Sequence, residues 1–500
     1  MGIIIRQSLK SAIASYSGVL LGALNIMVLF PKYFEDSQFG LTRVLLAVST
    51  IVAQFAEFGG SNVINRFFPF FRDDRNTLKR FIFWILVVAV SFCAVILFVI
   101  YVFRAPILAH YEERGSPLIV DFFGYVFPLT VFILIFGLLE SYSRSLLRVA
   151  LPVFLRDTYV RLFQLAAILL YIFKWVDFNE FMALFAASYG TAMLIILGYV
   201  FWLDRHFITP SLSFRKHEML REITIYGLYS TMTSGVWRTI FQLDIIMLSY
   251  LGSADALGGV AVYSIAAYIV ILIQLPQRAL TQIATPIISS AIKHEQWETV
   301  KELYQRVGLN QLVVGIFLAL GIWVNLHNLY HFLPKTFHHM DGIVLALLIG
   351  KLFDMMTSFN GEIIAYSKHF RFNFWTGILL VALGIVTNLI LIPVYGILGA
   401  AIATSFTLVV VNMLRIIFIY RKKKVHPFSK EMIIAFPVGL AVLGLYYLTP
   451  DLDNVYLNFI ARSALVVLVF VPLVFFLKVS KDLNDTGVKI FDRAKSIIGL

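Results

Sequence analysis

The residues best able to do chemistry in this chain are charged side chains within otherwise apolar segments. Five of them are basic: Arg43, Arg238, Arg278, Lys351 and Arg462. A guanidinium group binds phosphate oxygens through two parallel N–H donors, so a cavity that holds several such cations would suit an anionic ligand. Arg43 and Arg462 stand near the ends of their segments, where long side chains can extend to the membrane surface. The deeper Arg238, Arg278 and Lys351 are therefore the first candidates for substrate binding.

Acidic residues lie in the same apolar segments, namely Glu57, Asp244, Asp354 and Glu362. Carboxylates at such positions could bind cations or carry protons. Arg238 and Asp244 are six residues apart and do not face each other on a helix, so each needs a partner on another helix or a ligand. Lys351 and Asp354 are three residues apart and could neutralise each other. The structural and the functional interpretation of this last pair both stay open.

Smaller polar residues recur at steps of three and four on these segments, which places them on one side of a 3.6-residue helix. Asn25 belongs to such a stripe on the first segment, and Gln242 and Gln274 belong to stripes on the seventh and eighth. A polar side chain in hydrocarbon is costly unless it faces protein or water. We therefore predict that the first, second, seventh, eighth and tenth segments enclose a hydrated cavity, whereas the almost wholly apolar third and fourteenth face lipid.

The composition requires these segments to be membrane helices. Hydrophobic residues make up 60% of the 500 residues, charged residues only 14%, and the mean hydropathy is +0.84, whereas about 25% of a typical soluble domain is charged. This excludes the disordered, fibrous and disulfide-rich classes, and the single Cys93 allows no disulfide framework or thiolate metal cage. The net charge of +12 is then expected to reflect membrane topology rather than nucleic-acid binding.

We predict an all-α polytopic membrane protein with fourteen transmembrane helices. They lie near 11–31, 41–65, 81–103, 117–139, 151–173, 180–203, 222–251, 256–286, 307–326, 341–365, 372–392, 396–419, 431–449 and 457–477. With the amino terminus inside, most of the 41 Lys and Arg residues fall in cytoplasmic connections, as the positive-inside rule requires. Both termini are therefore predicted to be cytoplasmic, and the first helix to be a retained anchor.

The connections between these helices are too short to carry catalytic chemistry. The sequence has no nucleotide-binding, serine-hydrolase or zinc-protease motif and no CxxC. His327, His331, His338 and His339 gather after the ninth helix, where we favour an interfacial belt over a metal pair. The basic cluster at 421–424 is expected to contact anionic headgroups. We predict no catalytic residue, no metal and no cofactor, while coupling to H⁺ or Na⁺ stays open.

The chain contains a weak internal repeat. In 16–69 and again in 229–286, a striped helix, a short loop and a long striped helix end at a proline. Both halves begin inside and run six helices, so the repeat is parallel, about an axis normal to the membrane. The predicted domains are an N-terminal lobe (1–215), a C-terminal lobe (216–425), two added helices (426–480) and a cytoplasmic amphipathic tail (481–500) on the inner membrane surface.

Three segments carry a family resemblance: NLILIPVYGILGAAIAT at 388–404, FGLTRVLLAVSTIVAQFAEFGGSNVINRFFP at 39–69 and QLDIIMLSYLGSADALGGVAVYS at 242–264. They resemble the polysaccharide flippases of the MATE-like MOP superfamily, and the resemblance covers nearly the whole chain. In the first segment, which begins at Asn388, Pro393 and Gly396 would close a tight outer turn. Gly399 and its small neighbours would let the twelfth helix pack closely.

The resemblance implies two pseudo-symmetric six-helix lobes around a V-shaped central cavity that opens alternately to each side. It implies a flippase that moves an undecaprenyl-diphosphate-linked oligosaccharide, such as an O-antigen, capsule or exopolysaccharide repeat unit, across the bacterial cytoplasmic membrane. In the related lipid II flippases, arginines on the first, second and eighth helices approach the pyrophosphate. Arg43 and Arg278 are the nearest counterparts here, Arg238 is a third candidate, and the first helix offers only Arg6, at its inner end.

The implied partners are the lipid-linked oligosaccharide, the bilayer and a glycan polymerase, without nucleic acid, and we expect a monomer. Two other functions stay open. One is a cation-coupled multidrug antiporter of the MATE kind, which the mostly cationic deep residues disfavour. The other is a membrane-embedded glycan polymerase or transferase, which the short outer loops disfavour.

Overall fold

The computed structural model describes residues 2–205, 207–231, 236–252 and 255–485, and within these ranges it contains helices and no strands. Contacts divide the chain into two compact units, Met1–Ile265 and Ala266–Leu500. Because α12 and α13 pack against α4 and α3, they belong to the first unit. This division therefore does not coincide with the lobe boundary at 215/216, which stays a prediction. Most of the predicted amphipathic tail, 486–500, lies outside the described residues.

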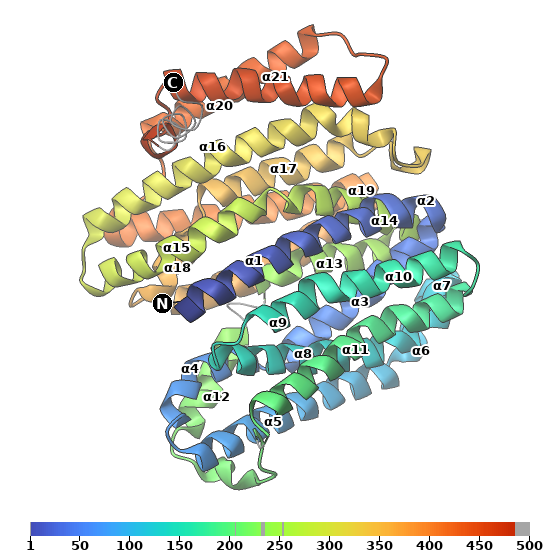
Figure 1. The fold of residues 1–500 in the computed structure, drawn as a ribbon, viewed down its shortest axis with the longest axis vertical. Coiled ribbons are helices and arrows are strands. Elements are labelled where there is room, and N and C mark those ends of the chain that lie inside the picture. The colour runs from blue at the N-terminus through green and yellow to red at the C-terminus, as the bar shows by residue number, and fades with distance from the viewer. Residues whose placement is uncertain (1, 206, 232–235, 253–254, 486–500) are drawn as a thin grey trace. The chain divides into compact units, whose positions relative to one another are not determined.

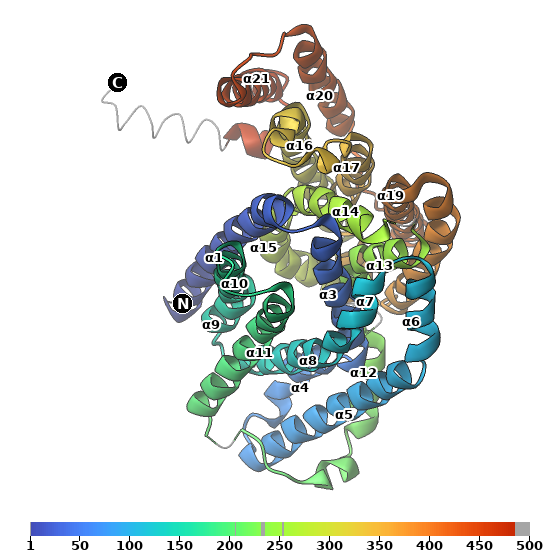
Figure 2. The same ribbon diagram turned by 90° about the vertical axis from the view of Figure 1, so that its right-hand side faces the viewer.

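The first unit runs from the amino terminus into the middle of α14 (Figure 1). Its elements are α1 (Gly2–Ala23), η1 (Leu24–Leu29), α2 (Phe30–Tyr33), α3 (Asp36–Ala56), α4 (Gly60–Phe71), α5 (Arg75–Val102), α6 (Arg104–Glu113), α7 (Pro117–Phe122), η2 (Phe123–Tyr125), α8 (Val126–Ser145), α9 (Ala150–Val153), η3 (Phe154–Tyr159), α10 (Val160–Ile172), α11 (Phe178–Leu203), η4 (Leu212–Lys216), α12 (Leu220–Ser230), α13 (Val236–Leu251) and the first part of α14 (Ala256–Ile271). Helix α1 lies along α9, η3 and α10, and α11 lies along α8 (Figures 1 and 2).

The second unit holds the remaining helices. Its elements are the end of α14, α15 (Gln274–Lys293), α16 (Trp297–Tyr330), η6 (Lys335–Phe337), α17 (Asp341–Met356), α18 (Asn360–Tyr366), α19 (Arg371–Lys423), α20 (Lys430–Leu448) and α21 (Val455–Phe476). Helices α20 and α21 pack against α16 through a buried aliphatic cluster that includes Leu312, Val438 and Phe470 (Figure 2).

Within the described residues, every predicted membrane segment is mainly helical. Nine described helices are long and apolar enough to cross a membrane, or ten if the bent pair α17 and α18 forms one span. The count of fourteen stays a prediction, because several predicted spans are divided into shorter helices and two others are joined in α19. Among the nine, α5 and α21 have the smallest shares of buried residues in their most apolar 18-residue windows, 17% and 22%, as expected for the third and fourteenth segments.

Helix α19 joins the predicted eleventh and twelfth segments across one residue. Gly396 has φ 58° and ψ −130°, a backbone conformation that disfavours any residue with a Cβ. Three residues later, a Cβ on Gly399 would overlap the carbonyl oxygen of Leu391. Gly396 thus serves the turn and Gly399 serves the close approach of the two arms, while Pro393 is exposed and Asn388 buried. The positive φ of Gly396 agrees with a turn at this residue, and the role of the whole motif stays a prediction.

Several predicted spans are broken near their middle. Helix α3 ends before Glu57, and α4 begins at Gly60 after Phe58 and Gly59, which both have positive φ, 50° and 68°. Helices α14 and α15 are likewise separated at 272–273, in the part of the chain that corresponds to α3 and α4 in the predicted repeat. Helices α17 and α18 meet at 41°. Interrupted helices at corresponding positions agree with a parallel repeat.

Polar contacts at one end of the second unit fasten α21 to α16. Asn458 donates to Asn328 Oδ1 at 2.9 Å, and Asn325 donates to Ser463 Oγ at 3.2 Å. The Arg462 side chain is buried and donates to the carbonyl oxygens of Tyr446 and Thr449 at the end of α20. Arg462 also lies 2.8 Å from the exposed Asp451 in the connection after α20, and its extension to the membrane surface stays a prediction.

Candidate functional site

The basic candidates differ in what surrounds them. Arg43 on α3 is half-buried, and its guanidinium carbon lies 5.4 Å and 5.1 Å from the ring centres of Phe30 and Phe39. Such cation–π contacts place the guanidinium between two aromatic rings. The backbones of Arg238 and Arg278 lie in α13 and α15, but their side chains are outside the described residues.

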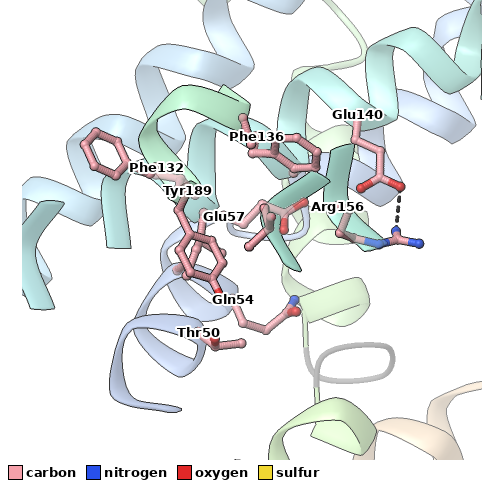
Figure 3. A pocket seen from close by; sticks show the side chains of 14 residues that line it. Thr50, Gln54, Glu57, Phe132, Phe136, Glu140, Arg156 and Tyr189 are labelled. Atoms are coloured by element: carbon pink, nitrogen blue, oxygen red, sulfur yellow. Dashed lines mark hydrogen bonds and ion pairs between the residues drawn. The ribbon is translucent and has the colours of Figure 1, made fainter. Parts of the chain in front are cut away.

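A pocket opens inside the first unit between α3, α8, η3, α10 and α11 (Figure 3). The space open to the centre of a water molecule is about 260 Å³. Apolar and aromatic side chains form most of its wall, among them Phe132, Phe136 and Val160. Thr50, Gln54, Glu57 and Tyr189 bring polar atoms to one side, and the pair Arg156 and Glu140 lies at the other side. The pocket therefore combines apolar faces with a few fixed polar groups, as ligand sites do.

Glu140 is the centre of an ion-pair network at this pocket. Its side chain is only 8% exposed, and its Oε1 lies 2.7 Å from both Arg144 and Arg156. Arg156 also contacts Asp157 at 2.9 Å, and Asp157 accepts a hydrogen bond from Ser15 of α1 at 2.7 Å. Two arginines thus face two carboxylates, so the network is close to neutral.

A π-helical turn positions this network. Arg156 and Asp157 lie in η3, a π-helical segment of six residues, and a second π-helical segment, η1, lies in the first predicted span. Wider turns of this kind interrupt the usual i→i−4 ladder and are frequent at functional sites. Asn25 of η1 donates to the carbonyl oxygen of Arg161 at 2.9 Å and is only 1% exposed. Asn25, predicted to bind substrate, here ties two helices together.

Sequence reasoning assigned Arg144 and Arg156 to a cytoplasmic connection and so missed them as pocket residues. The signal was present, because Arg156 and Asp157 both lie inside the predicted segment 151–173. Two adjacent opposite charges within a span need partners on other helices. The partner Glu140 stands 16 residues earlier in the sequence, and only the packing of α8 against η3 reveals it.

Glu57 occupies the break between α3 and α4. Its Oε1 accepts a hydrogen bond from the backbone N–H of Ser61 at 2.5 Å, which satisfies a donor at the start of α4. Glu57 also borders a second, mainly apolar pocket of about 230 Å³ whose lining includes Trp84, Phe92 and Thr224. This carboxylate thus has a structural role at the break in addition to its place in the polar pocket.

The other candidates in the first unit lie on α13. Asp244 is fully buried and accepts a hydrogen bond from the hydroxyl of Tyr263 on α14. Gln242 is half-buried two residues earlier. In the second unit, Gln274 is half-buried at the first residue of α15. Asp244 therefore connects two helices through its hydrogen bond, and its role in ion coupling stays a prediction.

A buried polar network occupies the second unit where α17 and α18 meet α19. Lys351 Nζ lies 2.6 Å from Asp354 Oδ2, and Lys351 is only 4% exposed. Asn412 donates to the other oxygen of Asp354 at 3.2 Å, and Asn360 donates to Asn412 Oδ1 at 2.7 Å. In the structure, Lys351 and Asp354 therefore neutralise each other, as their spacing allowed.

A second buried cation, Arg415, lies close to this network. It donates to Thr376 Oγ1 at 3.0 Å and 2.9 Å and interacts electrostatically with Glu362, Asp354 and Tyr304. Sequence reasoning placed Arg415 with the cytoplasmic residues, although it lies inside the predicted segment 396–419. Glu362, a predicted coupling residue, is thus brought into the same electrostatic cluster as Asp354, whereas Glu57 and Asp244 lie in the first unit.

Comparison with known proteins bears on the family and the fold. A family model described as polysaccharide biosynthesis protein matches residues 8–292, more than half of the chain. The solved structure of the lipid II flippase MurJ in an inward closed conformation matches with a TM-score of 0.73 at 16% identity, covering 95% of this chain and 98% of that one. A search of curated proteins found no match.

Two solved MATE transporters are also similar. One, from Vibrio cholerae, has a TM-score of 0.55 at 14% identity and covers 84% of this chain and 98% of that one. The other, an inward-facing multidrug resistance transporter of the MOP superfamily, has a TM-score of 0.59 at 12% identity and covers 83% and 94%. At these identities the likeness shows the fold, which is the one expected from the sequence.

Proposed function

Because the chain belongs to the polysaccharide biosynthesis protein family, we propose that it is a flippase for an undecaprenyl-diphosphate-linked oligosaccharide. Moving such a lipid from the cytoplasmic to the outer leaflet of a bacterial cytoplasmic membrane needs no covalent chemistry. The observation that carries the proposal is that a match to this family coincides with the fold of a lipid II flippase over 95% of the chain. The polar pocket within an apolar helical unit supports it, because a sugar head group needs such a lining.

Arg43, Arg238 and Arg278 would neutralise the diphosphate, with Gln242 and Gln274 contacting the sugars. Arg43 suits this role because its guanidinium lies beside the rings of Phe30 and Phe39, which orient it. Lys351 would contribute to phosphate binding only under one condition. Its ammonium pairs with Asp354 in this conformation, so it would reach a phosphate only after this ion pair breaks.

Substrate shifts an inward/outward equilibrium only by its different affinities for the two states, so directional transport needs removal of the product or a coupled ion. Asp354 is the coupling residue we favour among Glu57, Asp244, Asp354 and Glu362. Protonation of Asp354 at Oδ2 would remove the negative charge that holds the Lys351 ammonium, whereas Oδ1 could still accept from Asn412 of α19. A proton would thus change the charge available to the diphosphate.

The experiment is flipping of a fluorescent undecaprenyl-diphosphate oligosaccharide by the full chain in proteoliposomes, with and without a proton or sodium gradient. Transport that requires the diphosphate supports the flippase, and acceleration by a gradient identifies the ion. Failure with several glycans, together with gradient-driven export of an organic cation, would replace this function by a multidrug antiporter. Sugar transfer by the purified protein would replace it by a glycan transferase.

The same function predicts the surroundings of the protein. Both termini would lie in the cytoplasm, and a glycan polymerase would consume the product on the outer side. The chain would work as a monomer, because each copy carries both units of the fold. No nucleic-acid partner is expected.

A further inference from the structure

The polar pocket of the first unit, between α3, α8, η3, α10 and α11, has properties that select among ligands. We infer that it binds one uncharged sugar ring of the lipid-linked glycan and thereby reads the identity of the cargo, apart from the arginines that hold the diphosphate. This inference rests on the proposed function, and it assigns the substrate group that the pocket formed by Thr50, Gln54, Glu57, Glu140, Arg156 and Tyr189 receives.

The size of the pocket limits the ligand to about one ring. Sites for drug-sized molecules occupy roughly 300–1,000 Å³, whereas this pocket offers about 260 Å³. An oligosaccharide would not fit, but a single pyranose would. The rest of the glycan would have to remain outside the first unit's pocket.

The charge of the pocket argues against an anion. Arg156 is the cation of the lining, and both its partners, Glu140 at 2.7 Å and Asp157 at 2.9 Å, are carboxylates. A phosphate entering here would have to displace a carboxylate from Arg156 and would lie near Glu57 as well. Because Glu140 also holds Arg144, the cost of separating it from these arginines would be high. The diphosphate therefore belongs elsewhere.

The same contacts argue against an organic cation. The charge of Glu140 is offset by two guanidinium groups, and Glu57 already caps α4 through the N–H of Ser61. A neutral ligand with many hydroxyl groups avoids both conflicts. Its hydroxyls can donate to the carboxylates and accept from the amide of Gln54, while each ring has apolar C–H faces.

The arrangement of the lining matches such a ring. The polar ends of Thr50, Gln54 and Tyr189 gather on one side of the pocket, and Phe132 and Phe136 contribute aromatic surface (Figure 3). A site built to hydrogen-bond a hydroxyl strongly rejects analogues that lack it, because its polar groups are then left unpaired. The pocket thus has the means to discriminate one sugar from another.

The test compares two lipids and two tyrosine variants on the same helix. Flipping by the full chain in proteoliposomes is measured with undecaprenyl-diphosphate N-acetylglucosamine and with bare undecaprenyl diphosphate. Tyr189→Phe and Gln54→Leu should each raise the KM for the sugar-bearing lipid by about tenfold, the loss of one hydrogen bond to a ligand, and change flipping of the bare lipid by less than about twofold. Tyr199→Phe, also on α11 but outside the pocket, should behave as wild type on both. Equal loss on both lipids, or loss on neither, would overturn the inference.

A binding measurement separates this inference from the proposed function. Saturation-transfer NMR of methyl N-acetylglucosaminide with the full chain in nanodiscs needs no transport. Signal in wild type and Tyr199→Phe that is lost in Gln54→Leu would uphold the sugar site even if no lipid is flipped. Displacement of that signal by tetraphenylphosphonium or inorganic pyrophosphate, or its absence in wild type, would overturn the sugar site whether or not the lipid moves.

Discussion

Glu140 illustrates how one residue can organise a site inside a membrane protein. It is almost fully buried and accepts from two arginines, one on its own helix and one on η3. Removing one partner of a buried ion pair leaves an uncompensated charge, which costs far more than the pair itself contributes. Stability at this point and the shape of the pocket therefore depend on the same carboxylate.

We expect Glu140→Gln to lower the free energy of unfolding by about 1–3 kcal/mol, because Arg144 and Arg156 lose their charged partner but remain half exposed. Thermal unfolding in detergent measures this change. The double variant Glu140→Gln/Arg156→Gln should recover part of it, and the exposed Glu113→Gln should have no effect. A single variant as stable as wild type would show that the network contributes nothing to folding.

For the pair Lys351 and Asp354 we expect a different pattern of stability changes from that at Glu140. Lys351→Met should destabilise the second unit by about 1–3 kcal/mol, because the largely buried Asp354 carboxylate then keeps the amide of Asn412 and the more distant charge of Arg415 but loses its ion-pair partner. Lys351→Met/Asp354→Asn should regain most of that stability while losing any acceleration of transport by a proton gradient. Thermal unfolding and gradient-driven flipping of both variants check this. A stable double variant that still responds to the gradient would remove Asp354 from the coupling proposal.

At the scale of elements, the turns and breaks of the helices carry the most specific sequence requirements. Gly396 supplies a positive φ, and Gly399 supplies space for the carbonyl oxygen of Leu391. These are different physical demands on the same residue type. They make the two arms of α19 lie against each other without a long connection.

Gly399→Ala should destabilise the protein by about 1–3 kcal/mol through overpacking, and Gly396→Ala by about 1–2 kcal/mol through left-handed backbone strain. Gly444→Ala on α20 is the matched control, since a Cβ there meets nothing within 4 Å. Melting temperatures of the three variants give the comparison. Equal tolerance at 399 and 444 would contradict the close approach.

The loop between α20 and α21 holds a carboxylate, Asp451, through which the stability of the protein should depend on pH. The hydrogen bond from Arg462, together with one from Asn458, holds the pKa of Asp451 below its ordinary value of 3.8. A carboxylate with a lowered pKa in the folded state stabilises the protein above the unfolded-state pKa, and this contribution is lost as the pH falls through the lowered value. The effect is small, because Asp451 is largely exposed.

We therefore expect Asp451→Asn to lower the melting temperature slightly at neutral pH, and the difference from wild type to shrink as the pH falls below the ordinary pKa and through the lowered one. Melting curves of both proteins between pH 7 and pH 3 measure the difference. A gap that stays constant over this range would show that Asp451 acts through its shape rather than its charge.

At the scale of the whole molecule, the proposed transport would have to combine a contact with the diphosphate and a contact with the glycan. The fold is that of a lipid II flippase and of MATE transporters. The structure describes polar sites within each of its two units. We propose that the arginines of the predicted second, seventh and eighth helices supply the remaining electrostatic contact.

Arg238→Ala and Arg278→Ala should each abolish flipping of the diphosphate-linked lipid without changing the amount of protein in the membrane. The reason is that an unneutralised diphosphate cannot enter a low-dielectric cavity. Arg104→Ala on the exposed end of α6 is the control and should flip at the wild-type rate. Wild-type transport by both alanine variants would show that Arg238 and Arg278 do not bind the diphosphate.

Much of the fold follows from the sequence alone. Long apolar stretches must be helices in a membrane, because hydrocarbon offers no partners for backbone N–H and C=O groups. The structural roles of Gly396 and Gly399 could also be predicted from the sequence, because a turn and a close helix contact each restrict the residue type at one position. The spacing of Lys351 and Asp354 also allowed their pairing, although it left a functional interpretation equally open.

Only the tertiary structure decided which charges meet. Glu140 with Arg156 and Asp157 with Ser15 join residues of different helices, and Arg415 with Thr376 joins the two arms of α19 across Gly396. No periodicity within one straight helix reveals such pairs. Asn25, whose contact with substrate stays a prediction, likewise links to the carbonyl of Arg161 on another helix. Local sequence determines which face of a helix is polar, but the packing of side chains from distant segments determines whether that polarity is used within the protein or left for a substrate.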